Sequence, residues 1–558
     1  MSRVGACTLA IDGKGASAND RRVERNEVRI SFILRTVATS WIAVFANAVV
    51  GFFLTPYILH HIGDEAFGLW VLVVTLSGYY GFFDAGIRSS VLRYVSRYSA
   101  LGDRDDVNRV VATAFYFYLI ACVLTIFLTI LLVPILPGFF SFHSDTVRAF
   151  QSLFLLAGVV QGVTFPLIVF AGVLEAAARY DQVYLVQIGS LAFRVVLVIA
   201  VFRAGGGLFG VGAAVILSNL LAYVIQTPLA IRALGGLSLS PLWLSKSIFR
   251  DMLRYGAISF GVGTGEKLRG YIYPLVVAKF LSPTAVTIFS LPMKLLAFPT
   301  SGLATMTEIV NPISSHLETK KNFAKLRLLV QLSVQSAFLI LAPMVVFLLV
   351  FGRELLTLWV GARYASAYSL LVLLTLGMGT AATQCCVQSM LFGIERHKGL
   401  MWYRLGEGLA ISILGSVAVK VWGLEGFALV IAVTLLLTSL VLVPRHLCRI
   451  LDLPLRRYLI EGALKPCLVA LPLTGVLLGV HSLLVIHRWA DMIIAVLIGG
   501  LAYAFTLSIY LFGRSSVPCW LSLSVLDLLE EKYLRTNGFL KSFLLSRTVR
   551  PGESQTEL

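Results

Sequence analysis

Long stretches of apolar residues recur along the chain from Ser31 to Phe512, and only short polar segments separate them. A stretch of about 20 mostly apolar residues is long enough to cross a bilayer as a helix. No polar insertion between the stretches is large enough to bury a core of its own. The pattern therefore predicts an all-α polytopic membrane protein. A window of about 19 residues places about fourteen transmembrane helices, at roughly 32–59, 67–86, 110–133, 149–172, 183–202, 208–230, 255–278, 285–311, 328–350, 367–393, 405–421, 425–443, 461–486 and 492–512.

Composition supports this class. Of the 558 residues, 58% are hydrophobic and only 13% are charged, and the mean hydropathy is +0.86. The first apolar stretch is too long for the core of a signal peptide and follows about thirty residues of mostly polar tail, so we expect it to be a retained helix. The seven cysteines form no CxxC pair and His60-His61 lack further ligands, so we expect neither disulfides nor a metal site.

The basic residues are distributed unevenly over the connections. Alternate connections and both tails together hold 33 Lys and Arg, against 7 on the other side. Because basic residues remain on the cytoplasmic side, both termini are predicted to be cytoplasmic. The net charge of +17 mostly reflects this topology, so anionic lipid headgroups are its expected partner and nucleic acid is not.

An internal repeat appears when the chain is compared with itself. With an offset of 219 residues, Ile62–Phe115 overlays Leu281–Val334 in its pattern of turns, helices and basic connection. Six helices per copy is an even number, so the two copies have the same orientation and are related by a pseudo-two-fold axis along the membrane normal. The predicted parts are a cytoplasmic tail 1–31, a six-helix lobe 32–233, a cytoplasmic linker 234–254, a second six-helix lobe 255–446, an extra helix pair 460–513 and a cytoplasmic tail 514–558.

Four basic residues occupy the centres of predicted membrane helices: Arg194, Lys267, Arg269 and Lys294, with Glu266 as the acid at that depth. A charge at the bilayer midplane costs at least about 2.5 kcal/mol, so it normally faces a protein-lined or watery cavity. Arg194 has no acid within a helical turn and lies about 15 Å from its helix end. We therefore predict an anion-binding cavity, with these four residues as substrate ligands and Asn47 as part of its lining.

The segment 256–270 is rich in glycine, including Gly261, Gly263 and Gly265, and Pro274 follows it. Such a segment is a candidate broken helix that bends between access states. Alternatives remain for its charges: Arg269 can pair with Glu266 three residues earlier. Lys267 and Lys294 can instead bond carbonyls freed near Pro274, Pro292 or Pro299, and each polar lining residue can be a helix-packing contact.

Several short motifs resemble a known family. They are His61–Trp70, Phe83-Asp-Ala-Gly-Ile87 with Val91–Val95 and Gly102-Asp103, Arg179-Tyr180, Leu358-Trp-Val-Gly361 with Tyr364, and Phe392-Gly393 with Arg396. Together they resemble bacterial polysaccharide flippases, which export O-antigen and exopolysaccharide repeat units and belong to the multidrug/oligosaccharidyl-lipid/polysaccharide exporter superfamily. The resemblance spans residues 32–450. Family members commonly have twelve helices, so the last pair departs from the pattern.

The resemblance implies a flippase in the bacterial inner membrane. Its substrate would be an undecaprenyl-diphosphate-linked oligosaccharide, moved from the cytoplasmic to the outer leaflet by alternating access. It implies membrane lipids, and polymerase and glycosyltransferases of the same pathway, as partners, with coupling to protons or sodium left open. A multidrug or cation antiporter of the superfamily and a peptidoglycan-precursor flippase remain alternatives. No GxxxxGK[ST] motif and no long outer loop is present, so we expect neither an enzyme nor a cofactor.

Overall fold

The computed structural model describes residues 18–140, 142, 144–396 and 398–512. The side chains of 18–38, 144–145, 258–259, 261–269, 304–306, 308–309, 312, 398 and 512 lie outside this description. Residues 43–510 form one compact unit, and the account that follows concerns this unit. Every regular element in the described residues is a helix.

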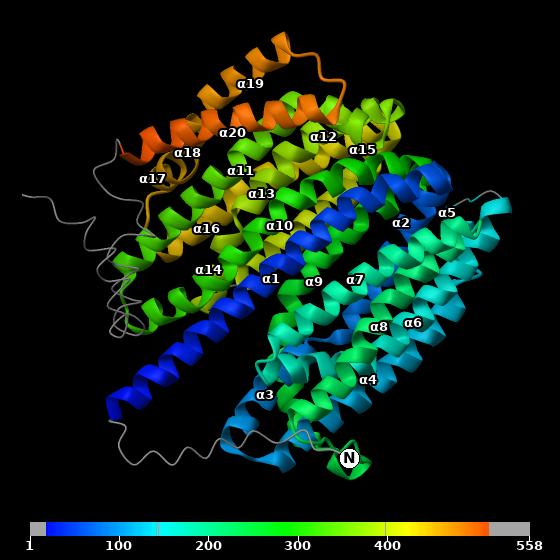
Figure 1. Ribbon diagram of the computed structural model, residues 1–558, viewed down its shortest axis with the longest axis vertical. Helices are drawn as coiled ribbons and strands as arrows, with labels where there is room; N and C mark the ends of the chain where they lie inside the picture. Colours follow the sequence, from blue (N-terminus) through cyan, green and yellow to red (C-terminus); the bar gives the residue numbers. More distant parts are fainter. Residues whose placement is uncertain (1–17, 141, 143, 397, 513–558) are drawn as a thin grey trace, which may run out of the picture. The chain divides into compact units, whose positions relative to one another are not determined.

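The first half of the chain folds into long helices joined by short turns (Figure 1). Side-chain caps fix several of their starts: Asp103, for example, accepts a hydrogen bond from the amide of Asp106 at 3.0 Å. The elements are α1 (Ala18–Ile62), α2 (Asp64–Tyr79), η1 (Tyr80–Asp84), α3 (Ile87–Leu101), α4 (Arg104–Leu132), α5 (Leu136–Phe140), α6 (Ser144–Ala176), α7 (Tyr180–Arg203), α8 (Leu208–Ala233) and η2 (Pro241–Trp243).

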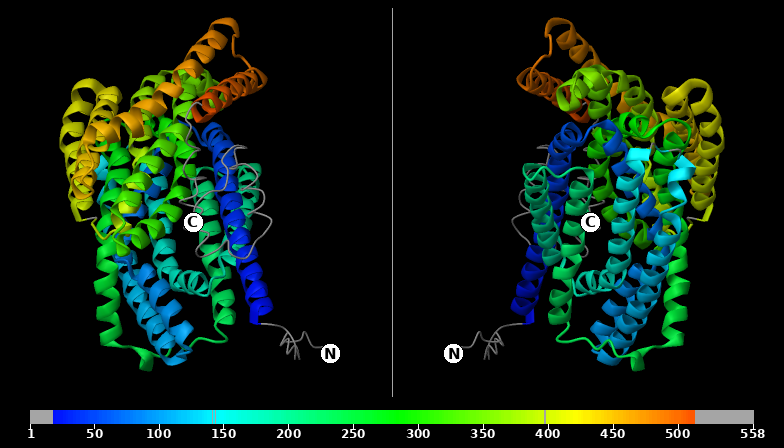
Figure 2. Two further views of the ribbon diagram at one scale, coloured as in Figure 1. Left: turned by 90° about the vertical axis from the view of Figure 1, so that its left-hand side faces the viewer. Right: turned by 90° about the vertical axis from the view of Figure 1, so that its right-hand side faces the viewer.

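The second half also folds into helices (Figure 2), and its helices contain more interruptions than those of the first half. Gly423 has a φ of 61° and divides α15 into two spans. The elements are α9 (Lys246–Phe280), α10 (Pro283–Thr319), α11 (Phe323–Val360), η3 (Ala362–Ala367), α12 (Tyr368–Leu374), η4 (Thr375–Gly379), α13 (Thr380–Thr383), α14 (Cys385–Gly393), α15 (Lys398–Leu437), η5 (Thr438–Leu442), α16 (Val443–Ile450), α17 (Leu455–Tyr458), η6 (Leu459–Leu464), α18 (Lys465–Val469), α19 (Leu471–Leu483) and α20 (Trp489–Phe512).

Helices long and apolar enough to cross a membrane number twelve within the described residues. One of them, residues 399–450, contains the break at Gly423 and so covers two predicted helices. A further predicted helix, 255–278, is part of α9, whose apolar stretch is interrupted by Glu266, Lys267 and Arg269. All fourteen predicted segments therefore fall on helices, and the all-α membrane class is confirmed.

The two halves repeat each other in their element boundaries. α2 begins at Asp64 and α10 at Pro283, and α4 begins at Arg104 and α11 at Phe323, so both pairs are 219 positions apart. The copies differ after their first helix. In the first copy Ala85 and Gly86 have φ of 47° and 75° and end the helix, whereas α10 continues through the equivalent positions Ala304 and Thr305. Thr305 is β-branched and cannot adopt this left-handed conformation without strain, so the second helix does not turn there.

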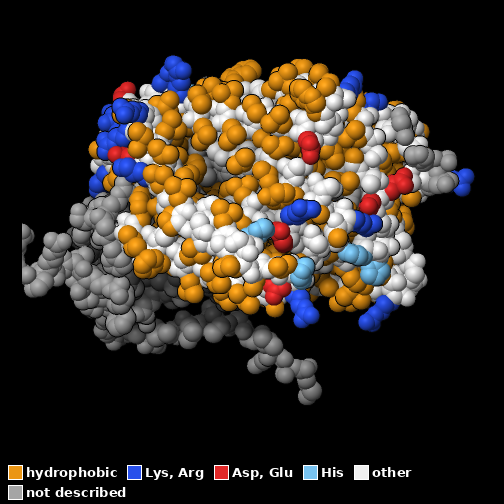
Figure 3. Space-filling model, turned by 90° about the horizontal axis from the view of Figure 1, so that it is seen from above, with side chains coloured by type: hydrophobic (Ala, Val, Ile, Leu, Met, Phe, Trp, Pro, Cys, Tyr) orange, Lys and Arg blue, Asp and Glu red, His pale blue; other side chains and the backbone are white. Residues whose placement is uncertain are grey.

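The surface of the unit is largely apolar. Side chains such as Phe45, Ile120 and Leu501 are about 70% exposed, and hydrophobic groups dominate the face seen in Figure 3. A soluble protein rarely exposes large contiguous apolar patches. This surface therefore fits a hydrocarbon environment, in which backbone groups are satisfied inside helices and apolar side chains face outward.

Candidate functional site

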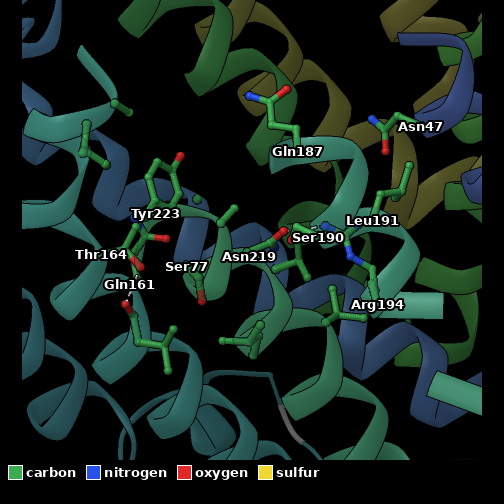
Figure 4. A pocket seen from close by; sticks show the side chains of 18 of the residues that line it. Asn47, Ser77, Gln161, Thr164, Gln187, Ser190, Leu191, Arg194, Asn219 and Tyr223 are labelled. Carbon is green, nitrogen blue, oxygen red and sulfur yellow. Dashed lines mark hydrogen bonds between the residues drawn. The ribbon is translucent and has the colours of Figure 1, made fainter. Parts of the chain in front are cut away.

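A cavity of about 760 Å³ lies within the first half of the chain. Side chains from α1, α2, α6, α7 and α8 surround it, and Arg88 of α3 and Tyr271 of α9 complete the lining. Figure 4 shows the polar groups of these helices turned toward a common space. The charged residues among its described lining are Arg88 and Arg194, both basic. The predicted cationic character of the cavity is thus present here.

Arg194 projects from α7 into the cavity, beside Asn219 of α8 (Figure 4). Its Nε donates to Ser218 Oγ at 3.2 Å, and its Nη2 donates to Asn219 Oδ1. Both partners are neutral, and within the described part of the chain no carboxylate lies within salt-bridge distance of Arg194. The guanidinium therefore keeps an uncompensated positive charge in a cavity lined by uncharged side chains and one other arginine.

One face of α8 lines the cavity along its length. Asn219, Tyr223 and Gln226 follow one another at helical spacing and all contribute to the wall. Gln226 is 2% exposed, and its Oε1 has no hydrogen-bond partner among the described residues. An unpaired buried acceptor is costly, so Gln226 suits a ligand that brings hydroxyl donors.

Arg88 lies where α3 begins, at the end of the unit that carries the basic connections α2–α4 and α8–α9; we call this the basic end. Its Nη2 contacts Glu175 Oε1 of α6 at 2.5 Å. From the sequence we counted Arg88 only as a topology signal. Its position directly after the Asp84-Ala-Gly turn was the available indication of another role, because that turn aims the start of α3.

The opposite end of the unit holds the two halves together. Asp64, at the start of α2, forms an ion pair with Arg363 at 2.8 Å and accepts a hydrogen bond from Tyr364. Trp359 Nε1 donates to the carbonyl of Phe52 at 2.7 Å. The motifs around Asp64 and Trp359, far apart in the sequence, therefore meet in space.

The other residues predicted for the site differ in their outcome. Lys294 is absent from the cavity lining, and its Nζ sits 4.4 Å from the centre of the Phe67 ring, where α2 packs on α10. Asn47 does line the cavity. The structure does not describe the side chains of Glu266, Lys267 and Arg269 or the surroundings of Gly261, Gly263 and Gly265. The backbone of this segment is part of the continuous helix α9.

Arg404 and Glu407 form a buried ion pair in the second half, which the sequence analysis does not predict. Arg404 Nη1 donates to both oxygens of Glu407, at 3.0 and 2.7 Å, and the two side chains are 3% and 0% exposed. We assigned Arg404 to a connection because we expected its helix to begin at residue 405, whereas α15 begins at Lys398. The i, i+3 spacing of Arg404 and Glu407 was the signal available in the sequence.

The chain is similar in sequence to a known protein family. A model of the family described as polysaccharide biosynthesis protein matches residues 62–369, more than half of the chain. The chain belongs to this family. A curated relative of this chain is the "Putative O-antigen transporter" of Shigella flexneri, 21% identical over 401 residues that cover 69% of this chain and 91% of the relative.

Two solved structures share the fold of this chain. The lipid II flippase MurJ, in an inward closed conformation, matches with a TM-score of 0.68 and 14% identity, over 85% of this chain and 98% of its own. An inward-facing multidrug resistance MATE family transporter of the MOP superfamily matches with a TM-score of 0.64 and 16% identity, over 76% of this chain and 99% of its own. The chain therefore shares the fold of these two transporters, and its twelve candidate spans within the described residues agree with a multi-pass membrane protein.

Proposed function

We propose that the protein is a flippase that moves an undecaprenyl-diphosphate-linked oligosaccharide from the cytoplasmic to the outer leaflet of the bacterial inner membrane. The environment of Arg194 is the main support for this proposal. Arg194 is a charged group within a membrane helix, it faces a cavity of about 760 Å³, and its bonded partners are neutral. A diphosphate supplies the missing negative charge, and arginine offers it forked donors.

The arrangement of contacts supports alternating access. Asp64 and Phe52 bond residues of the second half at the end opposite the basic end, so in this proposal a headgroup in the cavity leaves on that side only after these contacts separate. We propose that both termini are cytoplasmic, which makes the basic end the entry side. The basic residues of that end then also attract anionic lipid headgroups.

The test is transport of a fluorescent undecaprenyl-diphosphate glycan in proteoliposomes, read as loss of protection from a membrane-impermeant quencher. We expect Arg194→Gln to slow transport at least about tenfold, because a hydrogen bond to a charged group is worth about 1.5–3 kcal/mol. Arg232→Gln is the matched control: this arginine ends α8, is exposed and is absent from the cavity lining. Full transport by a stable Arg194→Gln protein would refute the proposal.

A cation antiporter is the second candidate, because the fold is shared with a multidrug transporter. Such a transporter needs an acid for its cation, whereas the described cavity lining contains no Asp or Glu. The two candidates differ in their response to charge removal. For a flippase, Lys267→Gln abolishes glycan export and Glu266→Gln has a milder effect; the reverse outcome would favour the antiporter.

A further inference from the structure

In the ion pair between Arg88 and Glu175, the arginine faces the cavity and the acid does not. Arg88 lines the same cavity as Arg194, whereas Glu175 is absent from the lining. The Arg88 side chain is 40% exposed and the Glu175 side chain only 16%. The acid therefore lies behind the arginine, and the arginine faces the cavity.

Local structure fixes where Arg88 points. The left-handed turn at Ala85 and Gly86 redirects the chain into α3 immediately before Arg88. A side chain at Gly86 would meet the carbonyl oxygen of Gly256 at 2.2 Å, so this turn is pressed against α9. Asp84 Oδ1 then accepts the Arg88 amide at 3.4 Å, and Tyr118 donates to the same carboxylate.

The guanidinium keeps donors for a ligand. It has five N–H groups, and its contact with Glu175 is made through Nη2 alone. Burial acts to lower the pKa of Arg88, but Glu175, Tyr223 and Asp84 act in the opposite direction, and the net shift of the pKa is upward. Arg88 is therefore charged throughout the physiological range.

The face of α8 gives a length scale for the cavity. Asn219 bonds Arg194, and Tyr223 lines the same cavity as Arg88. Four residues of helix correspond to about 6 Å along the axis, and the unpaired Gln226 lies about 10 Å from Asn219. A diphosphate group with its first sugar can bridge such a distance.

We propose that Arg88 forms a second anion-binding position in this cavity, at its basic end, and that Glu175 orients Arg88 and weakens its hold on the anion. The ligand class is a diphosphate ester of a polyprenol, so the inference rests on the proposed function. Arg194 and Arg88 then bind the headgroup at two depths, and the attenuated Arg88 releases it as the cavity changes access.

The experiment measures binding of geranylgeranyl diphosphate, a short polyprenyl diphosphate, to the purified full-length protein in detergent, alongside transport in proteoliposomes. Glu175→Gln is expected to bind about threefold or more tightly and to turn over more slowly, because Arg88 loses its counter-charge. Arg88→Gln/Glu175→Gln removes both charges without stranding a buried acid, and is expected to bind about tenfold more weakly. Arg109→Gln/Asp106→Asn is the matched control, since this ion pair of 2.9 Å is also near the basic end but absent from the cavity lining.

The outcomes separate the two claims. If the stable double variant binds as the wild type does, or if Glu175→Gln binds no more tightly, the pair only ties α3 to α6 and the inference is wrong. If Arg194→Gln weakens binding in the same assay while the Arg88 variants do not, the proposed function survives without this second position. If the wild type binds no diphosphate, the proposed function itself fails and the inference fails with it.

Discussion

The arginines of this protein differ in the groups that compensate their positive charge. Arg194 has only neutral partners and faces a cavity, whereas Arg404 is bonded to both oxygens of a buried carboxylate. A buried charge with a paired acid costs less than one without it, and breaking such a pair leaves the remaining charge uncompensated. Arg404 and Glu407 therefore belong to the architecture of the second half, whereas the environment of Arg194 supports the ligand-binding role that we propose for it.

This distinction predicts the effect of neutralising the buried pair. Arg404→Gln or Glu407→Gln alone should destabilise the protein by about 3–5 kcal/mol, because one buried charge loses its partner. Replacing both, as Arg404→Met/Glu407→Leu, should restore much of this stability. Thermal unfolding in detergent and the amount of protein in the membrane fraction measure the effect. Single variants as stable as the wild type would show that water or another group solvates the charge.

Residue types and depth were sufficient to predict Arg194 but not the faces of the helices. Lys294 is also a basic residue at the centre of a predicted membrane helix, yet its Nζ lies over the Phe67 ring, where α2 and α10 pack. Gly68 explains this close packing, since a side chain there would meet the Pro283 carbonyl oxygen at 1.8 Å. Arg88 was missed for the opposite reason: basic residues near a membrane surface usually report topology, and only the fold brings this one to the cavity.

Elements were predicted better than sites. The length of the apolar stretches was enough to locate the fourteen segments. The starts of α2, α4, α10 and α11 confirm the 219-residue offset of the repeat. The break after α2 depends on Gly86, whose φ is 75°. The pairing of elements far apart in sequence, such as α6 with Arg88 of α3, depends on tertiary packing that local pattern does not encode.

α9 is the element for which a hinge remains a prediction. Its backbone is helical through Gly261, Gly263 and Gly265 in this structure, and each glycine costs about 1 kcal/mol relative to alanine. Replacing the three by alanine should keep the protein folded but slow transport by favouring one access state. Gly270→Ala is the matched control, because Gly270 lies in the same helix with open space at its Cβ position. Cysteines at the two ends of the cavity would report a changed labelling ratio; unchanged labelling with full transport would leave the three glycines as packing residues.

The contact between α2 and η3 predicts a second conformational effect. Asp64→Asn removes the ion pair with Arg363, which is 54% exposed, so the expected change is only about 1 kcal/mol. That is about a fivefold shift toward the state open at this end. A cysteine at Asn47 should react correspondingly faster with a reagent added from that side. Glu65→Gln, in the neighbouring acid, should leave the rate unchanged, and equal rates for both variants would exclude a closing role for Asp64.

At the scale of the whole molecule, the sequence has to satisfy two environments at once. Apolar side chains face outward along the unit, while the polar groups of five helices converge on a cavity inside it. We expect the basic residues to determine which end of the unit faces the cytoplasm, because basic residues generally stay on that side during insertion. Direction of transport is therefore tied to topology: if the orientation were reversed, the closed end near Asp64 would face the cytoplasm and the proposed entry side would be wrong.

The bias of 33 against 7 basic residues predicts that topology directly. In a cysteine-free background, a cysteine at Asp105, at the exposed start of α4, and a reporter fused after Leu558 should both be cytoplasmic. A cysteine at Gly207, in the turn between α7 and α8, should react with an impermeant reagent added outside. Gly207 suits this test better than Asp64, because Asp64 bonds Arg363 and Tyr364, whereas Gly207 is exposed and nothing lies within 4 Å of a Cβ there. Fourteen crossings return the chain to the side on which it began, so an external Leu558 with a cytoplasmic Asp105 would mean an odd number of crossings after α4. The extra helices beyond residue 455 would then be the place to look for the segment that does not cross.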